Sequence, residues 1–134
     1  MRRYILDTGV AADLIYRRGS AFKTAQERAQ QGASIGVAMP TVGELFAGVE
    51  YSKTREANLK IVVRNLTKLT HWPFDRAAAE EFGRIFAYLR RTGHPIQQID
   101  MQIAAVALTL GNCTLVTKDI DFRAIPELTI ETWT

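Results

Sequence analysis

The chain has 134 residues, of which 47% are apolar and 23% charged, a composition typical of one soluble globular domain covering residues 1–134. Lys and Arg outnumber Asp and Glu by 17 to 14, and the resulting net charge of +3 is too small to mark a strongly basic protein. A single cysteine, Cys113, excludes an internal disulfide and a cysteine-based zinc cluster, and fits a reducing compartment.

The N-terminal segment does not have the pattern of a signal peptide. Arg2 and Arg3 precede an apolar run that ends before Asp7. This run is too short to be the apolar central region of a signal peptide. No apolar run reaches about 18 residues, so no membrane span is expected. We therefore predict a cytoplasmic protein with no membrane contact.

Short apolar strands alternate with helical patterns along the whole chain. Runs of strand-forming residues predict buried strands and one final edge strand, at residues 4–6, 34–39, 70–74, 113–117 and 128–131. Apolar residues at helical spacing predict helices between them, at residues 10–18, 20–31, 40–49, 55–69, 75–92 and 98–110. This alternation predicts an α/β fold, a three-layer α/β/α domain with a mostly parallel sheet of four to five strands.

Several helix boundaries and core positions follow from particular residues. Ser20 and Asp75 are expected to cap the helices that follow them. Pro40 suits the first turn of a helix. In the 55–69 helix, we expect the apolar side chains to face the core, namely Leu59, Val62, Val63, Leu66 and Leu69.

Aspartates follow two of the predicted buried strands. Asp7 comes directly after the first strand, and Asp119 and Asp121 follow the 113–117 strand. Ligands of open α/β sheets bind at the carboxyl ends of the strands. Asp7 alone could equally cap the next helix, and either later aspartate could belong to a simple turn. Two aspartates spaced two residues apart are harder to explain as a turn.

Two further acids lie in the first turns of apolar helices. Glu44 follows the 34–39 strand, and Asp100 opens the helix that leads to the 113–117 strand. Each has an ordinary interpretation, because Glu44 could lie at the rim of the apolar stripe and Asp100 could simply favour the helix dipole. Their positions nevertheless place both acids over the same edge of the sheet as Asp7 and Asp119.

Four converging carboxylates predict a cation between them. Like charges within several ångströms repel strongly unless a cation holds them. No cluster of Cys or His competes as ligand, and an all-oxygen site suits Mg²⁺ or Mn²⁺. Such ions polarise a phosphodiester and activate water for its hydrolysis.

Short motifs that occur in order along nearly the whole chain resemble those of the PIN-domain ribonucleases, specifically the VapC toxins of bacterial toxin–antitoxin pairs. Each motif is weak alone, and their order and spacing together are specific. They are Tyr4-Ile5-Leu6-Asp7-Thr8, Glu44-Leu45 with Gly48-Val49-Glu50, Asp100 with Ile103-Ala104-Ala105, Leu115-Val116-Thr117-Lys118-Asp119-Ile120-Asp121-Phe122, and Ile125-Pro126-Glu127-Leu128 through Glu131-Thr132-Trp133.

The resemblance implies a Mg²⁺-dependent endoribonuclease, with Mn²⁺ as a possible substitute, that acts as the toxin of a type II pair on structured RNA such as tRNA or rRNA. It implies Asp7, Glu44, Asp100 and Asp119 as catalytic residues, and Asp7, Asp100, Asp119 and Asp121 as metal ligands. It also implies a cognate VapB-type antitoxin that covers the acidic cleft, and a homodimer.

Other side chains are candidates for supporting roles. Thr8 follows Asp7 directly, and Thr117 precedes Asp119 by two residues. Either hydroxyl could orient the neighbouring carboxylate, although Thr is common at strand ends. Arg17, Lys118 and Arg123 are candidates for binding RNA phosphates. Each of these cations could also be only a solvated surface charge.

Gly9 departs from the family pattern, which usually has Asn directly after the Asp-Thr or Asp-Ser pair. An Asn there could brace the neighbouring carboxylate, and such partners change metal affinity or activity by about 10–100-fold. The alternative function is therefore a non-catalytic PIN-like module that binds RNA or its antitoxin. A phosphatase of the haloacid-dehalogenase type is disfavoured, because Gly9 lies where that motif needs a second Asp.

Overall fold

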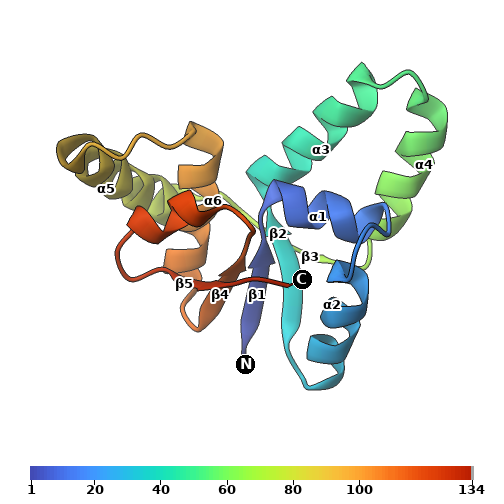
Figure 1. The fold of residues 1–134 in the computed structure, drawn as a ribbon, viewed down its shortest axis with the longest axis horizontal. Helices are drawn as coiled ribbons and strands as arrows, with labels where there is room; N and C mark the ends of the chain where they lie inside the picture. The colour runs from blue at the N-terminus through green and yellow to red at the C-terminus, as the bar shows by residue number, and fades with distance from the viewer. Residues whose placement is uncertain (134) are drawn as a thin grey trace.

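The computed structural model of the chain describes residues 1–133, and its centre is a five-stranded parallel sheet with the order β3-β2-β1-β4-β5 (Figure 1). Every neighbouring pair of strands is parallel. The strands are β1 (Arg3–Leu6), β2 (Ser34–Ala38), β3 (Thr70–Trp72), β4 (Cys113–Val116) and β5 (Thr129–Glu131). The predicted mostly parallel α/β fold is confirmed.

Helices cover both faces of this sheet. They are α1 (Thr8–Ile15), α2 (Ala21–Gln30), α3 (Met39–Tyr51), α4 (Arg55–Leu66), α5 (Arg76–Thr92) and α6 (Gln98–Leu110), followed by the short 3₁₀ helix η1 (Ile120–Ala124). In Figure 1, α3 and α4 lie on one side of the sheet and α5 lies on the other. No helix among residues 1–133 combines the length and apolar character that crossing a membrane would need.

The side chains of β1 explain why this strand contains no polar residue. Tyr4 and Leu6 pack in the core under α1, α2, α3 and α4, whereas Ile5 packs in the second core under α5 and α6. All three side chains are buried. Because successive strand side chains point to opposite faces, a central strand between two helical layers must be apolar throughout.

Gly36 in β2 is required by the close approach of β3. A Cβ atom at this position would lie 2.3 Å from the carbonyl oxygen of Thr70 and 2.8 Å from the ring of Trp72. The Trp72 ring would have to move, and the contact with the Thr70 carbonyl could be relieved only by a shift of the backbone of β3. Pairing of β2 with β3 therefore depends on glycine at this point.

Three expectations about helix details were wrong. Ser20 precedes α2, but its hydroxyl caps nothing and is buried without a hydrogen-bond partner, because the Ser20 backbone is not extended as capping requires. Val63 in α4 is 47% exposed, whereas Val62 and Leu66 are buried. The helix packs through a narrow stripe, and Val63 lies about 100° around the axis from Val62. Helix α4 also ends at Leu66 rather than residue 69.

Candidate active site

Asp7 is held in place from two directions. It caps α1, since the Val10 amide donates to Asp7 Oδ1 at 2.8 Å, and the Thr117 hydroxyl donates to Oδ2 at 2.5 Å. Burial raises the pKa of Asp7, and these two hydrogen bonds oppose that rise without cancelling it. Of the two interpretations of Asp7, helix cap and site residue, the structure allows both at once, because capping occupies only one of its oxygens.

Thr117 connects Asp7 to the turn that carries the later aspartates. Its hydroxyl, which donates to Asp7, also accepts a hydrogen bond from the Asp119 amide at 2.9 Å. Asp119 in turn caps η1, because the Asp121 amide donates to Asp119 Oδ1 at 2.9 Å. The turn predicted after β4 is therefore a 3₁₀ helix that holds both aspartates in fixed positions.

Glu44 is fixed by a contact between α1 and α3. The Thr8 hydroxyl donates to the Glu44 carboxylate, and the buried Thr41 hydroxyl lies 3.4 Å from Thr8 Oγ1. Thr41 was not singled out from the sequence, where only its position one helical turn before Glu44 could have indicated it. Glu44 is thus aimed by residues that lie far apart in the chain.

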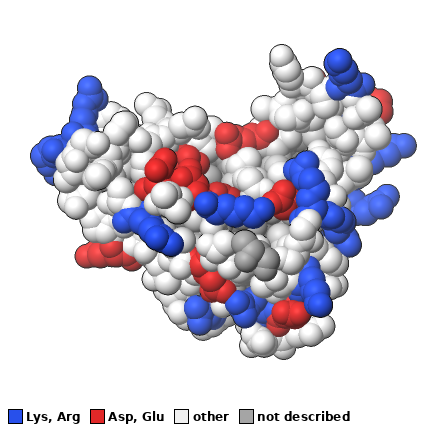
Figure 2. Space-filling model, viewed as in Figure 1, with Lys and Arg blue, Asp and Glu red and all other residues white. Residues whose placement is uncertain are grey.

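The charge of Asp100 interacts with those of the other four predicted acids. Burial and the negative charges of Asp7, Glu44, Asp119 and Asp121, in decreasing order, raise the pKa of Asp100 to about 6. The structure therefore places the other four predicted acids within electrostatic range of Asp100, and the Thr117 hydroxyl joins Asp7 to the turn that carries Asp119 and Asp121. Figure 2 shows Asp and Glu side chains gathered near the middle of one face, with Lys and Arg beside them. We refer to these five residues as the acidic cluster.

The acidic cluster fits a hard divalent cation by its chemistry. As the side chains lie, no three His, Cys, Asp or Glu residues within 1–133 are grouped closely enough to form a metal site by themselves. Mg²⁺, however, typically takes one or two carboxylates directly and keeps several water ligands. Repulsion among carboxylates, seen in the raised pKa of Asp100, is what a cation would relieve.

Comparison with known proteins assigns the family. The PIN-domain family model matches residues 4–128. The chain belongs to the PIN-domain family. It is 30% identical over 133 residues to ribonuclease VapC2 of Haemophilus influenzae, and 30% identical over 134 residues to the tRNA(fMet)-specific endonuclease VapC of Salmonella typhimurium. Each match covers 99% of both proteins, which places this PIN domain among the VapC ribonucleases.

A solved structure has the same fold over nearly the whole chain. The match is to VapBC2 from Rickettsia felis bound to a DNA fragment from its promoter, with a TM-score of 0.90 and 28% identity. It covers 98% of this chain and 99% of the other. The resemblance to VapC toxins inferred from short motifs is confirmed.

Two cations border the acidic cluster of the PIN domain. Arg18 and Lys118 line a cavity of about 430 Å³ together with Asp7, Asp13 and Asp119. Asp13, which the sequence did not single out, accepts from Lys118 Nζ at 3.1 Å and from Arg18 Nε at 3.3 Å. Its position on the helix that Asp7 caps was the available signal.

The other predicted cations lie differently. The Arg17 guanidinium stacks on the Phe22 ring, 3.4 Å from its centroid, and does not line this cavity. Arg123 is an exposed residue of η1. Their assignment to RNA binding stays a prediction.

Cys113 has no place in the chemistry of this site. It begins β4, at the end of the strand opposite Thr117 and Asp119. Burial raises the pKa of the Cys113 thiol to about 11, so the thiolate that a nucleophile requires is scarce at neutral pH.

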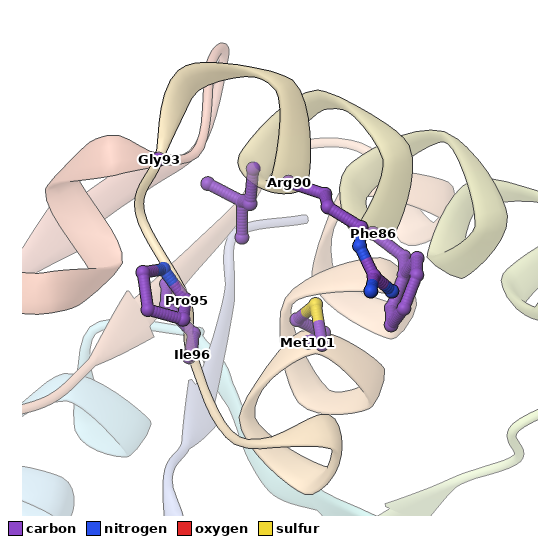
Figure 3. Close-up of a pocket in the computed structure, with 7 residues that line it drawn as sticks. Phe86, Arg90, Gly93, Pro95, Ile96 and Met101 are labelled. Carbon is purple, nitrogen blue, oxygen red and sulfur yellow. The ribbon is translucent and has the colours of Figure 1, made fainter.

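A second hollow lies away from the carboxylates, between α5, the following loop and α6 (Figure 3). It measures about 300 Å³, and the residues that line it are Phe86, Leu89, Arg90, Gly93, Pro95, Ile96 and Met101. This lining contains one cation and no acid or nucleophile. The hollow therefore offers apolar contact but no catalytic groups.

Proposed function

We propose that the acidic cluster is the active site of a Mg²⁺-dependent endoribonuclease, with Mn²⁺ as a substitute, and that the chain is the toxin of a VapBC-type pair. The observation that carries the proposal is the convergence of Asp7, Glu44, Asp119 and Asp121 on Asp100. Carboxylates brought together from three helices and two strand ends are unfavourable for stability. Their placement is explained by a cation that hydrolysis of a phosphodiester requires.

Asp7, Asp100 and Asp119 would hold the ion directly or through water, with Asp121 as an additional or substitute ligand. When bound, Mg²⁺ would lower the pKa of a coordinated water and neutralise charge on the phosphate oxygens. Thr117 supports this set, because one hydroxyl group orients both Asp7 and Asp119. Thr117 is therefore assigned a positioning role.

Glu44 would orient the attacking water. The Thr8 hydroxyl holds its carboxylate at the contact between α1 and α3. An aligned water attacks the phosphorus opposite the leaving oxygen, and positioning supplies much of the rate. No side-chain nucleophile is needed in this mechanism.

Structured RNA is the proposed substrate, with tRNA as the first candidate and rRNA as the second. A relative of 30% identity over the whole chain is a tRNA(fMet)-specific endonuclease. We also propose a VapB-type antitoxin as partner, because the VapBC2 complex contains a protein of the same fold. The homodimer that the family resemblance implies is kept as a proposal.

Cleavage assays with an Asp7→Asn variant test the proposal. Asn caps helices as well as Asp does, so this change removes the charge while preserving the start of α1. The wild-type protein, free of antitoxin, should cut tRNA into discrete fragments with Mg²⁺ or Mn²⁺ and not with EDTA. Asp7→Asn should show no cutting, whereas the control Glu27→Gln, on the exposed face of α2, should cut normally.

Two results would contradict this function. Cutting that persists in EDTA and in Asp7→Asn would show that another site or another protein is responsible. RNA binding without cutting by the wild-type protein would support a non-catalytic PIN-like module instead.

A further inference from the structure

Asp13, Arg18 and Lys118 form a charged trio at the border of the acidic cluster. Asp13 lies in α1, Arg18 in the turn after α1, and Lys118 between β4 and η1. Each oxygen of the Asp13 carboxylate receives one cation, since Oδ1 is 3.3 Å from Arg18 Nε and Oδ2 is 3.1 Å from Lys118 Nζ. The trio thus joins α1, which Asp7 caps, to the β4–η1 turn, which carries Asp119.

In this trio the Asp13 carboxylate is partly buried, whereas the two cations that it holds are exposed to solvent. The Asp13 side chain is 23% exposed, whereas those of Arg18 and Lys118 are 62% and 60% exposed. An ammonium has three donors and a guanidinium five, and Asp13 occupies one donor of each. Within residues 1–133 the other donors of Arg18 and Lys118 have no hydrogen-bond partner, so they can bind an anion in the cavity that the trio shares with Asp7 and Asp119.

The backbone of the turn after α1 brings Arg18 back to Asp13. Arg17 has a φ of 58°, a left-handed conformation that is uncommon for residues other than Gly, Asn and Asp. The Arg18 amide then donates to the Asp13 carbonyl at 2.8 Å. Arg18 is therefore held to Asp13 through both its backbone and its side chain.

We propose that this trio binds an RNA phosphate next to the scissile one, and that Asp13 is a positioning residue which holds Arg18 and Lys118 for that purpose. The inference rests on the proposed ribonuclease function. RNA must approach a cluster of carboxylates that repels its phosphates, and fixed cations at the border offset that repulsion. Figure 2 shows Lys and Arg side chains directly beside the acidic patch on this face.

Binding of labelled tRNA to the cleavage-inactive Asp7→Asn protein isolates this site from catalysis. Fluorescence anisotropy would be measured at constant Mg²⁺ over a series of KCl concentrations. Each cation that contacts a phosphate contributes about −0.7 to −0.9 to the slope of log K against log salt. Adding Arg18→Gln or Lys118→Gln should weaken binding and make this slope shallower by about that amount.

Asp13→Asn, added to the same Asp7→Asn protein, distinguishes a positioned site from loose surface charge. It removes a negative charge, so simple electrostatics predicts tighter binding of RNA. We expect binding to weaken instead, by up to about fivefold, because both cations lose their anchor. The matched control is Glu81→Gln, which frees Arg84 from its 2.6 Å ion pair on α5 and should leave affinity unchanged.

A double variant tests whether Asp13 acts through Lys118. With Lys118→Gln already present, Asp13→Asn should have a smaller effect than it has alone.

Tighter or unchanged binding in Asp13→Asn, or unchanged salt slopes in both cation variants, would overturn the proposal. The cation variants retain Asp13 and decide the question even if Asp13→Asn does not fold. Absence of cleavage by the wild-type protein would refute the proposed function without affecting these binding results.

Discussion

Replacing Asp100 by Asn should make the metal-free protein more stable at neutral pH. The pKa of Asp100 is raised from 3.8 to about 6 by burial and by the other acids of the cluster. Above this pKa the group is ionised in both the folded and the unfolded protein, and its raised pKa lowers the free energy of unfolding. At about 1.4 kcal/mol for each pH unit, the full effect is about 3 kcal/mol.

The expected gain is smaller than this full value, because Asp100 is only partly buried and solvent screens its interactions. Asp100 lies in the first turn of α6, where a carboxylate interacts favourably with the helix dipole by about 0.3–1 kcal/mol. The Asn variant loses that interaction, so we expect the free energy of unfolding to rise by about 2 kcal/mol. For a chain of this size, the melting temperature should rise by about 6–10 °C.

The direction in which the free energy of unfolding changes with pH is the most stringent test of this prediction. Because the folded protein holds the Asp100 proton more tightly, the stability of the metal-free wild type should fall as pH rises from about 4 to about 6. Asp100→Asn should lack this part of the fall, and the two proteins should differ least near pH 4. Urea unfolding in EDTA at a series of pH values measures both, with Glu27→Gln as the control for removal of an exposed acid. A variant that is less stable than wild type at pH 7.5, or a difference that does not change with pH, would refute the reasoning.

Three further outcomes can be checked with the same proteins and methods. Gly36→Ala should destabilise the fold by more than about 2 kcal/mol in urea unfolding, because its Cβ would meet the Thr70 carbonyl. Gly83→Ala, on the open face of α5, should instead stabilise the fold by about 1 kcal/mol, and equal effects of the two substitutions would contradict this account. Thr117→Val should lower kcat/KM and Mn²⁺ affinity by about 10–100-fold through loss of its hydrogen bond to Asp7, and calorimetry showing normal Mn²⁺ binding would exclude that role. Mg²⁺ at about 100 times its Kd should raise the free energy of unfolding of wild type by about 2.7 kcal/mol, and Asp7→Asn should show little of this gain.

Much of the fold could be predicted because its signals are local. The apolar run of β1 and the aspartate after it are visible in seven residues, and α6 has the predicted bounds of Gln98 to Leu110. The order of strands and helices places Asp7, Glu44 and Asp119 at one edge of a parallel sheet without any knowledge of contacts. The structure brings these side chains together, and their catalytic roles remain predictions.

The parts that could not be predicted depend on contacts between distant segments. Thr8 meets Glu44 only because α1 packs on α3, and Asp13 meets Lys118 only because the β4–η1 turn passes the side of α1. Likewise, nothing in the sequence distinguishes the exposed Val63 from its buried apolar neighbours Val62 and Leu66. Which apolar side of α4 faces the core is decided by packing and not by periodicity alone.

The position of β1 between β2 and β4 sets the order in which this enzyme can assemble during synthesis. Strand β1 is made about a hundred residues before β4, one of its two neighbours, which begins only at Cys113. Contacts between such distant segments form late, because closing a long loop of chain is entropically unfavourable. Asp119 and Asp121 reach Asp7 only after that step, so an incomplete chain on the ribosome carries no assembled acidic cluster.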